Sequence, residues 1–149
     1  MCIRDSSTIT AGNKINIHKA ITLAGISSLP EVPVEQEREW REKEEHLIEN
    51  SRTKQMMPLG KFLLEDLLNK KSFFNESIKN FNKPLLVIHG DKDPTVPMDS
   101  ALKLNKEVEN SELEIIKNAD HVFNVKHPFN GSSPELDQAI KRVISFLKE

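Results

Sequence analysis

Two short apolar runs that break into polar turns constrain the fold of this chain more than any other feature. One occupies residues 85–89 and the other residues 113–116. A helical pattern separates them, formed by Ala101, Leu104 and Val108. Strands that are apolar throughout are typical of parallel sheets covered on both faces, and parallel strands need a crossover between them, usually a helix. We therefore predict two neighbouring parallel strands joined by a helix.

The rest of the chain adds one more strand and several helices. Residues 19–24 are short, apolar and β-branched, so we expect a buried strand there. Residues 31–50 place a thin apolar stripe beside dense charge, which predicts a solvated amphipathic helix. Residues 58–69 predict a second helix, with the proline at its start in the first turn. A final helix follows Ser133, a good N-cap residue.

The order of these elements is strand, helices, strand, helix, strand, helix, which indicates an α/β fold with about three parallel strands and flanking helices. The segment at residues 31–80 is far longer than the connections of about 2–6 residues common in α/β units. We interpret it as a helical insertion within one domain spanning residues 19–149. Residues 1–18 show no sustained period and are expected to be a tail.

Composition excludes several classes of protein. The 149 residues carry 21 basic and 23 acidic side chains, so no strong field favours nucleic acid or an anionic membrane as a partner. Cys2 is the only cysteine, which excludes an internal disulfide. The sequence has no apolar run of 18 residues and no signal-peptide pattern at its start, so we expect a soluble, cytoplasmic protein.

Polar side chains that follow the predicted strands are the candidates for chemistry, because ligands of parallel sheets bind beyond the carboxyl ends of the strands. Asp91 and Asp93 follow residues 85–89, and His121 follows residues 113–116. A histidine that acts as a base needs an acid to fix its tautomer, and either aspartate could supply it. His89 at the end of its strand is expected to be a packed histidine.

A metal site is a weaker interpretation of the same side chains. Histidine and carboxylate ligands suit several divalent ions, and the possible ligands are His89, Asp91, Asp93 and His121. A ligand pair spaced as His-Glu-x-x-His is absent from the sequence. We therefore predict no metal site among these residues.

Two tracts resemble the C-terminal half of the α/β-hydrolase family. The first is Pro84–Pro97, which ends in His-Gly-Asp-Lys-Asp-Pro-Thr-Val-Pro, and the second is Asn118-Ala119-Asp120-His121. Residues 121–129 resemble the tract that follows the histidine in esterase-like and serine-peptidase-like members. The resemblance covers residues 84–149 well, and residues 19–83 only by their arrangement. In such enzymes an insertion like residues 31–80 forms a cap over the pocket.

The resemblance implies the roles of the site residues. The family motif uses the acid three residues before the valine, which makes Asp93 the triad acid and leaves Asp91 to stabilise the turn. The resemblance also makes His121 the general base. The implied reaction is cleavage of an ester, thioester or amide by a serine hydrolase, acting on a small-molecule or peptide acyl substrate without a cofactor.

The nucleophile is the missing part of this pattern. No Gly-x-Ser-x-Gly elbow occurs in the sequence, and the family places it before the acid and the histidine. Ser27, two residues after Gly25, is a poor candidate because the second glycine is absent and no helix pattern follows. We expect the serine to lie upstream of this chain, and the chain by itself to be nearly inactive.

Other observations agree with a truncated chain. Residues 1–6 resemble translated adapter sequence, so we expect them to be artefactual. A truncated sheet would present an unpaired edge at residues 19–24, which predicts poor solubility or self-association. Two alternatives stay open. The chain could be a non-catalytic hydrolase-like module that binds a protein partner through residues 31–50, or its upstream nucleophile could be Asp or Cys.

Overall fold

The computed structural model describes residues 16–50 and 53–149 and divides the chain into two compact units. The first unit holds the described residues up to Ser28 together with Phe74–Glu149, and the second is Leu29–Phe73. Residues 1–15, most of the predicted tail, lie outside the described part of the chain.

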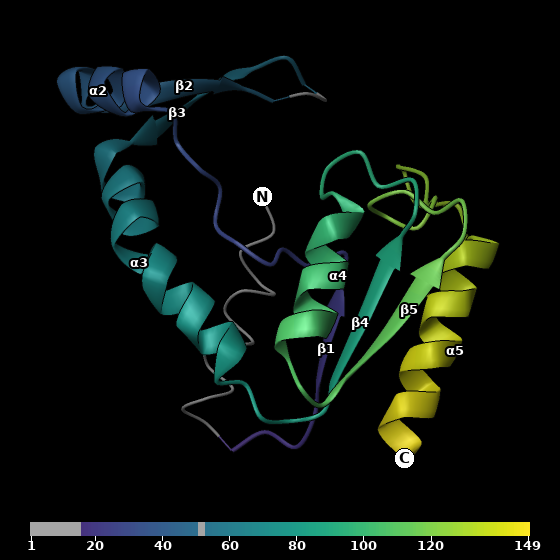
Figure 1. Ribbon diagram of the computed structural model, residues 1–149. Helices are drawn as coiled ribbons and strands as arrows, with labels where there is room; N and C mark the ends of the chain where they lie inside the picture. Colours follow the sequence, from purple (N-terminus) through teal and green to yellow (C-terminus); the bar gives the residue numbers. More distant parts are fainter. Residues whose placement is uncertain (1–15, 51–52) are drawn as a thin grey trace. The chain divides into compact units, whose positions relative to one another are not determined.

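The first unit is built on a three-stranded parallel sheet (Figure 1). Its strands are β1 (Ala20–Leu23), β4 (Leu85–Gly90) and β5 (Ser111–Ile116), in the order β1-β4-β5. All three lie where the sequence predicted strands, and the predicted α/β fold with parallel strands is confirmed. Within the described residues β1 pairs with β4 alone, so it forms one edge of the sheet.

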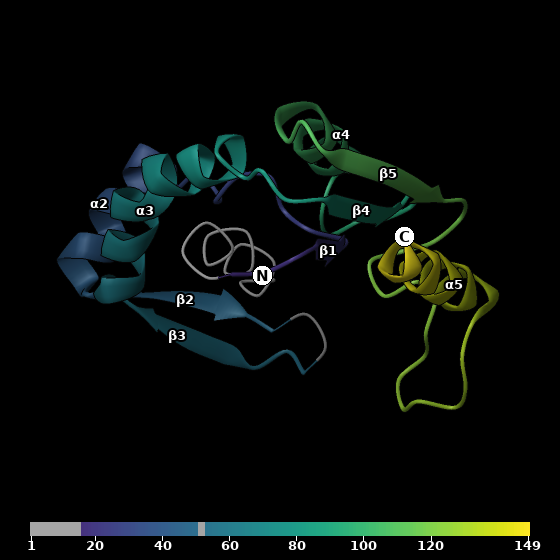
Figure 2. The same cartoon turned by 90° about the horizontal axis from the view of Figure 1, so that it is seen from below.

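Two helices cover opposite faces of this sheet (Figure 2). They are α4 (Met98–Glu107) and α5 (Pro134–Lys148). All six residues of β4 are buried, which explains its nearly continuous apolar character. One core cluster joins β4, β5, the loop after β5 and α5, and it consists of Leu86, Ile88, Ile116, Ala119, Phe123, Ala139 and Phe146. Because both faces of β4 are buried, packing fixes the position of the strand that leads to Asp91 and Asp93.

The carboxyl ends of β4 and β5 point the same way, so the loops that follow them meet at one edge of the sheet (Figure 1). The first loop leads from Gly90 to the start of α4, and the second leads from Ile116 to Ser133. Ser133 caps α5 as predicted, because its Oγ accepts a hydrogen bond from the backbone N–H of Leu136 at 3.0 Å. Both loops are thus anchored at each end by regular structure.

The second unit corrects the prediction of an all-helical insertion. Its helix α2 (Val34–Lys43) ends at Glu44, which adopts the left-handed conformation, so the helix expected over residues 31–50 is wrong beyond that point. An antiparallel hairpin follows, formed by β2 (Glu45–Glu49) and β3 (Met56–Gly60). Charged residues continue through Glu44 and Glu45, so the composition held no signal for the end of the helix.

The proline at position 58 lies in a strand and not in a first helical turn. Pro58 pairs with Leu47 across the hairpin, and a two-stranded sheet consists of edge strands, where a missing N–H is tolerated. Helix α3 (Lys61–Lys79) therefore begins three residues later than predicted and runs ten residues further. Neither α3 nor any other helix in residues 16–50 and 53–149 has the length and hydropathy needed to cross a membrane.

Candidate active site

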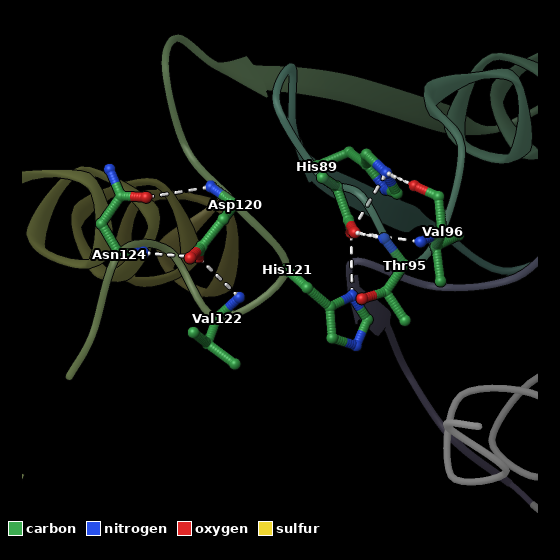
Figure 3. A network of polar contacts seen from close by, with 8 residues as sticks. His89, Thr95, Val96, Asp120, His121, Val122 and Asn124 are labelled. Carbon is green, nitrogen blue, oxygen red and sulfur yellow. Dashed lines mark hydrogen bonds and ion pairs between the residues drawn. The ribbon is translucent and has the colours of Figure 1, made fainter. Parts of the chain in front are cut away.

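The loop after β4 holds Asp93 through its own backbone. Oδ1 of Asp93 accepts hydrogen bonds from the backbone N–H groups of Thr95 at 2.7 Å and Val96 at 2.9 Å (Figure 3). This is the local turn that an aspartate forms readily with the residues that follow it. The side chain of Asp93 is fully shielded from solvent. One carboxylate oxygen is thus fixed by the chain, and Oδ2 remains for another partner.

A second polar network shapes the loop after β5. Oδ1 of Asp120 accepts from the backbone N–H groups of Val122 at 2.9 Å and Asn124 at 2.7 Å, while the N–H of Asp120 donates to Oδ1 of Asn124 at 3.1 Å (Figure 3). Phe123 and Asn124 both have positive φ, so the chain turns sharply there. These contacts on either side of His121 fix its backbone. No role was predicted for Asp120 or Asn124 from the sequence, although aspartate and asparagine are typical turn residues.

The two loops are bound to each other along their backbones. The N–H of Asp91 donates to the carbonyl of Ile116 at 3.2 Å, and the N–H of Lys92 donates to the carbonyl of Ala119 at 3.0 Å. Oδ1 of Asp91 accepts from the N–H of Asn118 at 2.5 Å. Asp91 therefore receives a backbone hydrogen bond, but from the loop after β5 and not from its own turn.

Asp93 and His121 meet between the loops. Oδ2 of Asp93 lies 2.8 Å from Nδ1 of His121. Burial alone would raise the pKa of Asp93, but hydrogen bonds from Val96, His121 and Thr95 stabilise the carboxylate and bring its pKa below the usual value. An ionised carboxylate only accepts hydrogen bonds, so Nδ1 of His121 carries the proton.

The other ring nitrogen of His121 is left free to act as a base. With the proton on Nδ1, a neutral imidazole keeps the lone pair on Nε2. Figure 3 shows this nitrogen on the side of the ring away from the carboxylate. The side chain is 28% exposed, so a reacting group can approach it. The arrangement can accept a proton at Nε2 and stabilise the resulting imidazolium through the carboxylate of Asp93.

His89 is buried, as expected of a packed histidine, but it also contacts the site. Its Nε2 lies 2.9 Å from the carbonyl oxygen of Val96 and 3.6 Å from Oδ2 of Asp93 (Figure 3). Position 89 precedes position 93 by four residues around a tight turn, and no contact between the two was predicted from the sequence. The structure therefore places two of the other candidates, His89 and His121, next to Oδ2 of Asp93.

Ser27, the serine candidate within the chain, lacks access to a substrate. It is 3% exposed in the segment after β1, so its hydroxyl is buried. Among residues 16–50 and 53–149, no group of three or more His, Cys, Asp or Glu side chains lies in position to hold one metal ion.

Comparison with known proteins agrees with this architecture. The family described as alpha/beta hydrolase fold matches residues 10–128 of the chain. A segment of 55 residues is 40% identical to a candidate non-heme chloroperoxidase of Synechocystis sp., which corresponds to 36% of this chain and 20% of that protein.

Solved structures with low sequence identity share the fold. Est1E from Butyrivibrio proteoclasticus with bound ferulic acid superposes with a TM-score of 0.71 at 18% identity, covering 96% of this chain and 54% of that one. The monoacylglycerol lipase of Paleococcus ferrophilus superposes with a TM-score of 0.61 at 13% identity. The superposition covers 94% of this chain and 62% of the lipase. The chain spans about half the length of the solved relatives that it matches.

Proposed function

The chain belongs to the alpha/beta hydrolase fold family, and from this premise we propose that it is the C-terminal part of a serine hydrolase in which Asp93 and His121 are the acid and the base of a Ser-Asp-His triad. The observation that carries the proposal is the 2.8 Å contact between Oδ2 of Asp93 and Nδ1 of His121 at the carboxyl ends of adjacent parallel strands. This contact leaves Nε2 of His121 basic and open to a reacting group.

His121 has two tasks in the proposed reaction. Its Nε2 takes the proton from the serine hydroxyl as the serine oxygen attacks the acyl carbon, and it then returns this proton to the leaving group. Asp93 holds the ring in the correct tautomer and stabilises the imidazolium, while remaining ionised itself. The lowered pKa of Asp93 supports this role, since only an ionised carboxylate can stabilise the imidazolium through its negative charge.

The serine and the oxyanion hole are proposed to come from protein outside this chain. The 149 residues contain no Gly-x-Ser-x-Gly elbow, and Ser27 is buried. The family order of nucleophile, acid and histidine puts the elbow before Asp93. The chain alone is therefore expected to be nearly inactive, since loss of a triad nucleophile reduces turnover by about 10⁶-fold in a well-studied serine protease.

The proposed substrates are esters, with thioesters and amides as related acyl compounds. Two names among the solved relatives, the esterase domain of a Rhodothermus marinus protein and a monoacylglycerol lipase, are consistent with ester chemistry. A small-molecule or peptide acyl substrate also agrees with the formal net charge of −2, which provides no strong field for a highly charged substrate. We propose a cytoplasmic location for the enzyme.

The test begins with the DNA upstream of codon 7. It should continue into an open reading frame with a strand, a Gly-x-Ser-x-Gly turn and a helix, and the extended protein should hydrolyse p-nitrophenyl butyrate. In that protein, His121→Ala should lower kcat by about 10⁶-fold and Asp93→Asn by about 10⁴-fold. His18→Ala is the matched control, because His18 is an exposed histidine in the same unit.

Three outcomes would contradict the proposal. The first is full activity of the His121→Ala variant. The second is labelling of this chain alone by a fluorophosphonate at Ser27, which would place the nucleophile within it. The third is a stop codon and a ribosome-binding site directly ahead of Met1, which would favour the non-catalytic module that binds a protein partner. An upstream elbow carrying Asp or Cys would keep the two assigned residues and change the nucleophile.

A haloperoxidase is a second candidate, favoured by the 55-residue match to a candidate non-heme chloroperoxidase. The two activities differ in their co-substrate, so the extended protein should be assayed with hydrogen peroxide and halide as well as with esters. Halogenation of monochlorodimedone with no ester hydrolysis would support the second candidate over the first.

A further inference from the structure

His89 lies at the end of β4 and forms a side-chain hydrogen bond with the backbone of Val96, which an apolar core residue could not form. Its side chain is fully buried, and its Nε2 lies 2.9 Å from the carbonyl oxygen of Val96. A carbonyl oxygen only accepts hydrogen bonds, so Nε2 must carry the proton. In the neutral ring, Nδ1 is then an acceptor, and it is buried with no hydrogen-bond partner among the described residues.

This burial has a cost that an apolar side chain would avoid. Leaving a buried polar atom unpaired is unfavourable, whereas an apolar side chain of similar shape would leave no such atom. The four residues before His89 in β4 are all apolar and buried. Packing alone therefore does not explain an imidazole at this position, and the hydrogen bond of its Nε2–H is the feature that distinguishes it.

That hydrogen bond acts on the residue that holds the acid. Val96 receives the Nε2–H of His89 at its carbonyl and donates its own N–H to Oδ1 of Asp93 at 2.9 Å. The same Nε2 atom lies 3.6 Å from Oδ2 of Asp93, the oxygen that accepts from His121. The hydrogen bond to Val96 and the nearby positive end of the Nε2–H dipole both favour one orientation of the Asp93 carboxylate. Figure 3 shows His89 beside Val96 and on the other side of the carboxylate from His121.

We propose that His89 is a positioning residue that fixes Val96 and thereby keeps Oδ2 of Asp93 directed at Nδ1 of His121. Its importance for turnover rests on the proposed function. The geometric claim can be tested on the chain as it exists, without measuring activity.

The test is a long-range ¹H–¹⁵N spectrum of the five histidines in the labelled chain. In the wild type, His89 should be the Nε2–H tautomer and His121 the Nδ1–H tautomer, with a downfield Nδ1–H proton. His89→Leu removes the donor and should abolish that downfield signal. His89→Gln offers an amide N–H that reaches the place of Nε2, and it should restore the signal.

Each alternative result would overturn the inference. If His89 in the wild type is the Nδ1–H tautomer, donation from its Nε2 to Val96 is excluded. This measurement does not depend on the folding of any variant. A folded His89→Leu chain with an unchanged His121 signal would assign His89 to packing alone, as would a His89→Gln chain that loses the signal equally. Full activity of an extended His121→Ala protein would instead refute the proposed function and leave the result for His89 standing.

Discussion

The backbone of Gly90 lies directly against the carbonyl group of Ala119. A Cβ atom at position 90 would fall well inside van der Waals contact with the carbonyl oxygens of Ala119 and Asp120. The same approach allows the N–H of Lys92 to bond the carbonyl of Ala119 at 3.0 Å. A glycine at the end of β4 is therefore what lets the loop of Asp93 come close enough to the loop of His121.

Gly90→Ala should push the two loops apart. Forcing an extra carbon against fixed backbone typically costs about 1–3 kcal/mol, and the free energy of unfolding in urea should fall by that amount. The downfield Nδ1–H signal of His121 should weaken as well. Gly60→Ala is the control, because no atom lies within 4 Å of a Cβ built there, and its effect should stay within about 0.5 kcal/mol. Equal stability of the two variants would contradict the close approach at Gly90.

The lowered pKa of Asp93 predicts a dependence of stability on pH. An acid whose pKa is lower in the folded state stabilises the fold fully above its unfolded-state pKa of about 3.9, and this contribution is lost as the pH falls through the folded-state pKa. Asp93→Asn cannot accept from Nδ1 of His121 through its amide nitrogen. The variant should be less stable by about 2 kcal/mol at pH 5, and the difference should narrow toward pH 3.

Urea unfolding at pH 5, 4 and 3 measures this effect. Asp66→Asn provides the control, because the Asp66 carboxylate is 65% exposed and forms only a surface ion pair with Lys70 at 3.4 Å. The free energy of unfolding of Asp66→Asn should differ little from that of the wild type, and by nearly the same amount at each pH. A difference for Asp93→Asn that stays constant down to pH 3 would show that the carboxylate of Asp93 is not stabilised by the fold.

Asp120 is predicted to hold the loop of His121 in shape. Asp120→Ala removes the acceptor of the N–H groups of Val122 and Asn124, so the free energy of unfolding should fall by about 1–2 kcal/mol and the Nδ1–H signal of His121 should broaden. Asp120→Asn keeps Oδ1 as an acceptor and should behave nearly like the wild type. If both variants lose the signal equally, charge and not the hydrogen bonds would account for the role of Asp120.

The sequence predicted the parallel sheet because its strands carry their own signal. Residues 85–89 are apolar enough to require cover on both faces, and the turn residues after them mark the carboxyl end. The contact between Asp93 and His121 follows from topology, since adjacent parallel strands bring these ends together. The hairpin from Glu45 to Gly60 had no comparable signal, because both of its strands are mostly exposed and its pairing depends on cross-strand contacts.

The role of His89 could not be read from the sequence for a different reason. A histidine before a glycine fits packing and hydrogen bonding equally well, and only the path of residues 91–96 decides which partner it meets. That path brings the carbonyl of Val96 back to Nε2 of His89. The same holds for Asp91, whose partner Asn118 lies 27 residues away and is set by the packing of one loop on the other.

Ser133 joins the end of the His121 loop to α5. Its Oγ accepts from the N–H of Leu136 and donates to the carbonyl of Phe123, a buried residue two positions after His121. Ser133→Ala should lower the free energy of unfolding by about 1–2 kcal/mol through loss of the N-cap, and the carbonyl of Phe123 would also lose its partner. Far-UV circular dichroism in urea measures the change.

The adjacent serine provides a matched control for this prediction. Ser132 is exposed and its Oγ donates to the carboxylate of Asp137 at 2.6 Å, so Ser132→Ala should change stability by no more than about 0.5 kcal/mol. Ser133→Thr retains a hydroxyl at the cap and should recover most of the loss. Because Phe123 lies in the loop stabilised by Asp120 and Asn124, Ser133→Ala should also broaden the Nδ1–H signal of His121, whereas Ser132→Ala should not. Equal effects of the two alanine variants would mean that α5 does not anchor the loop that carries His121.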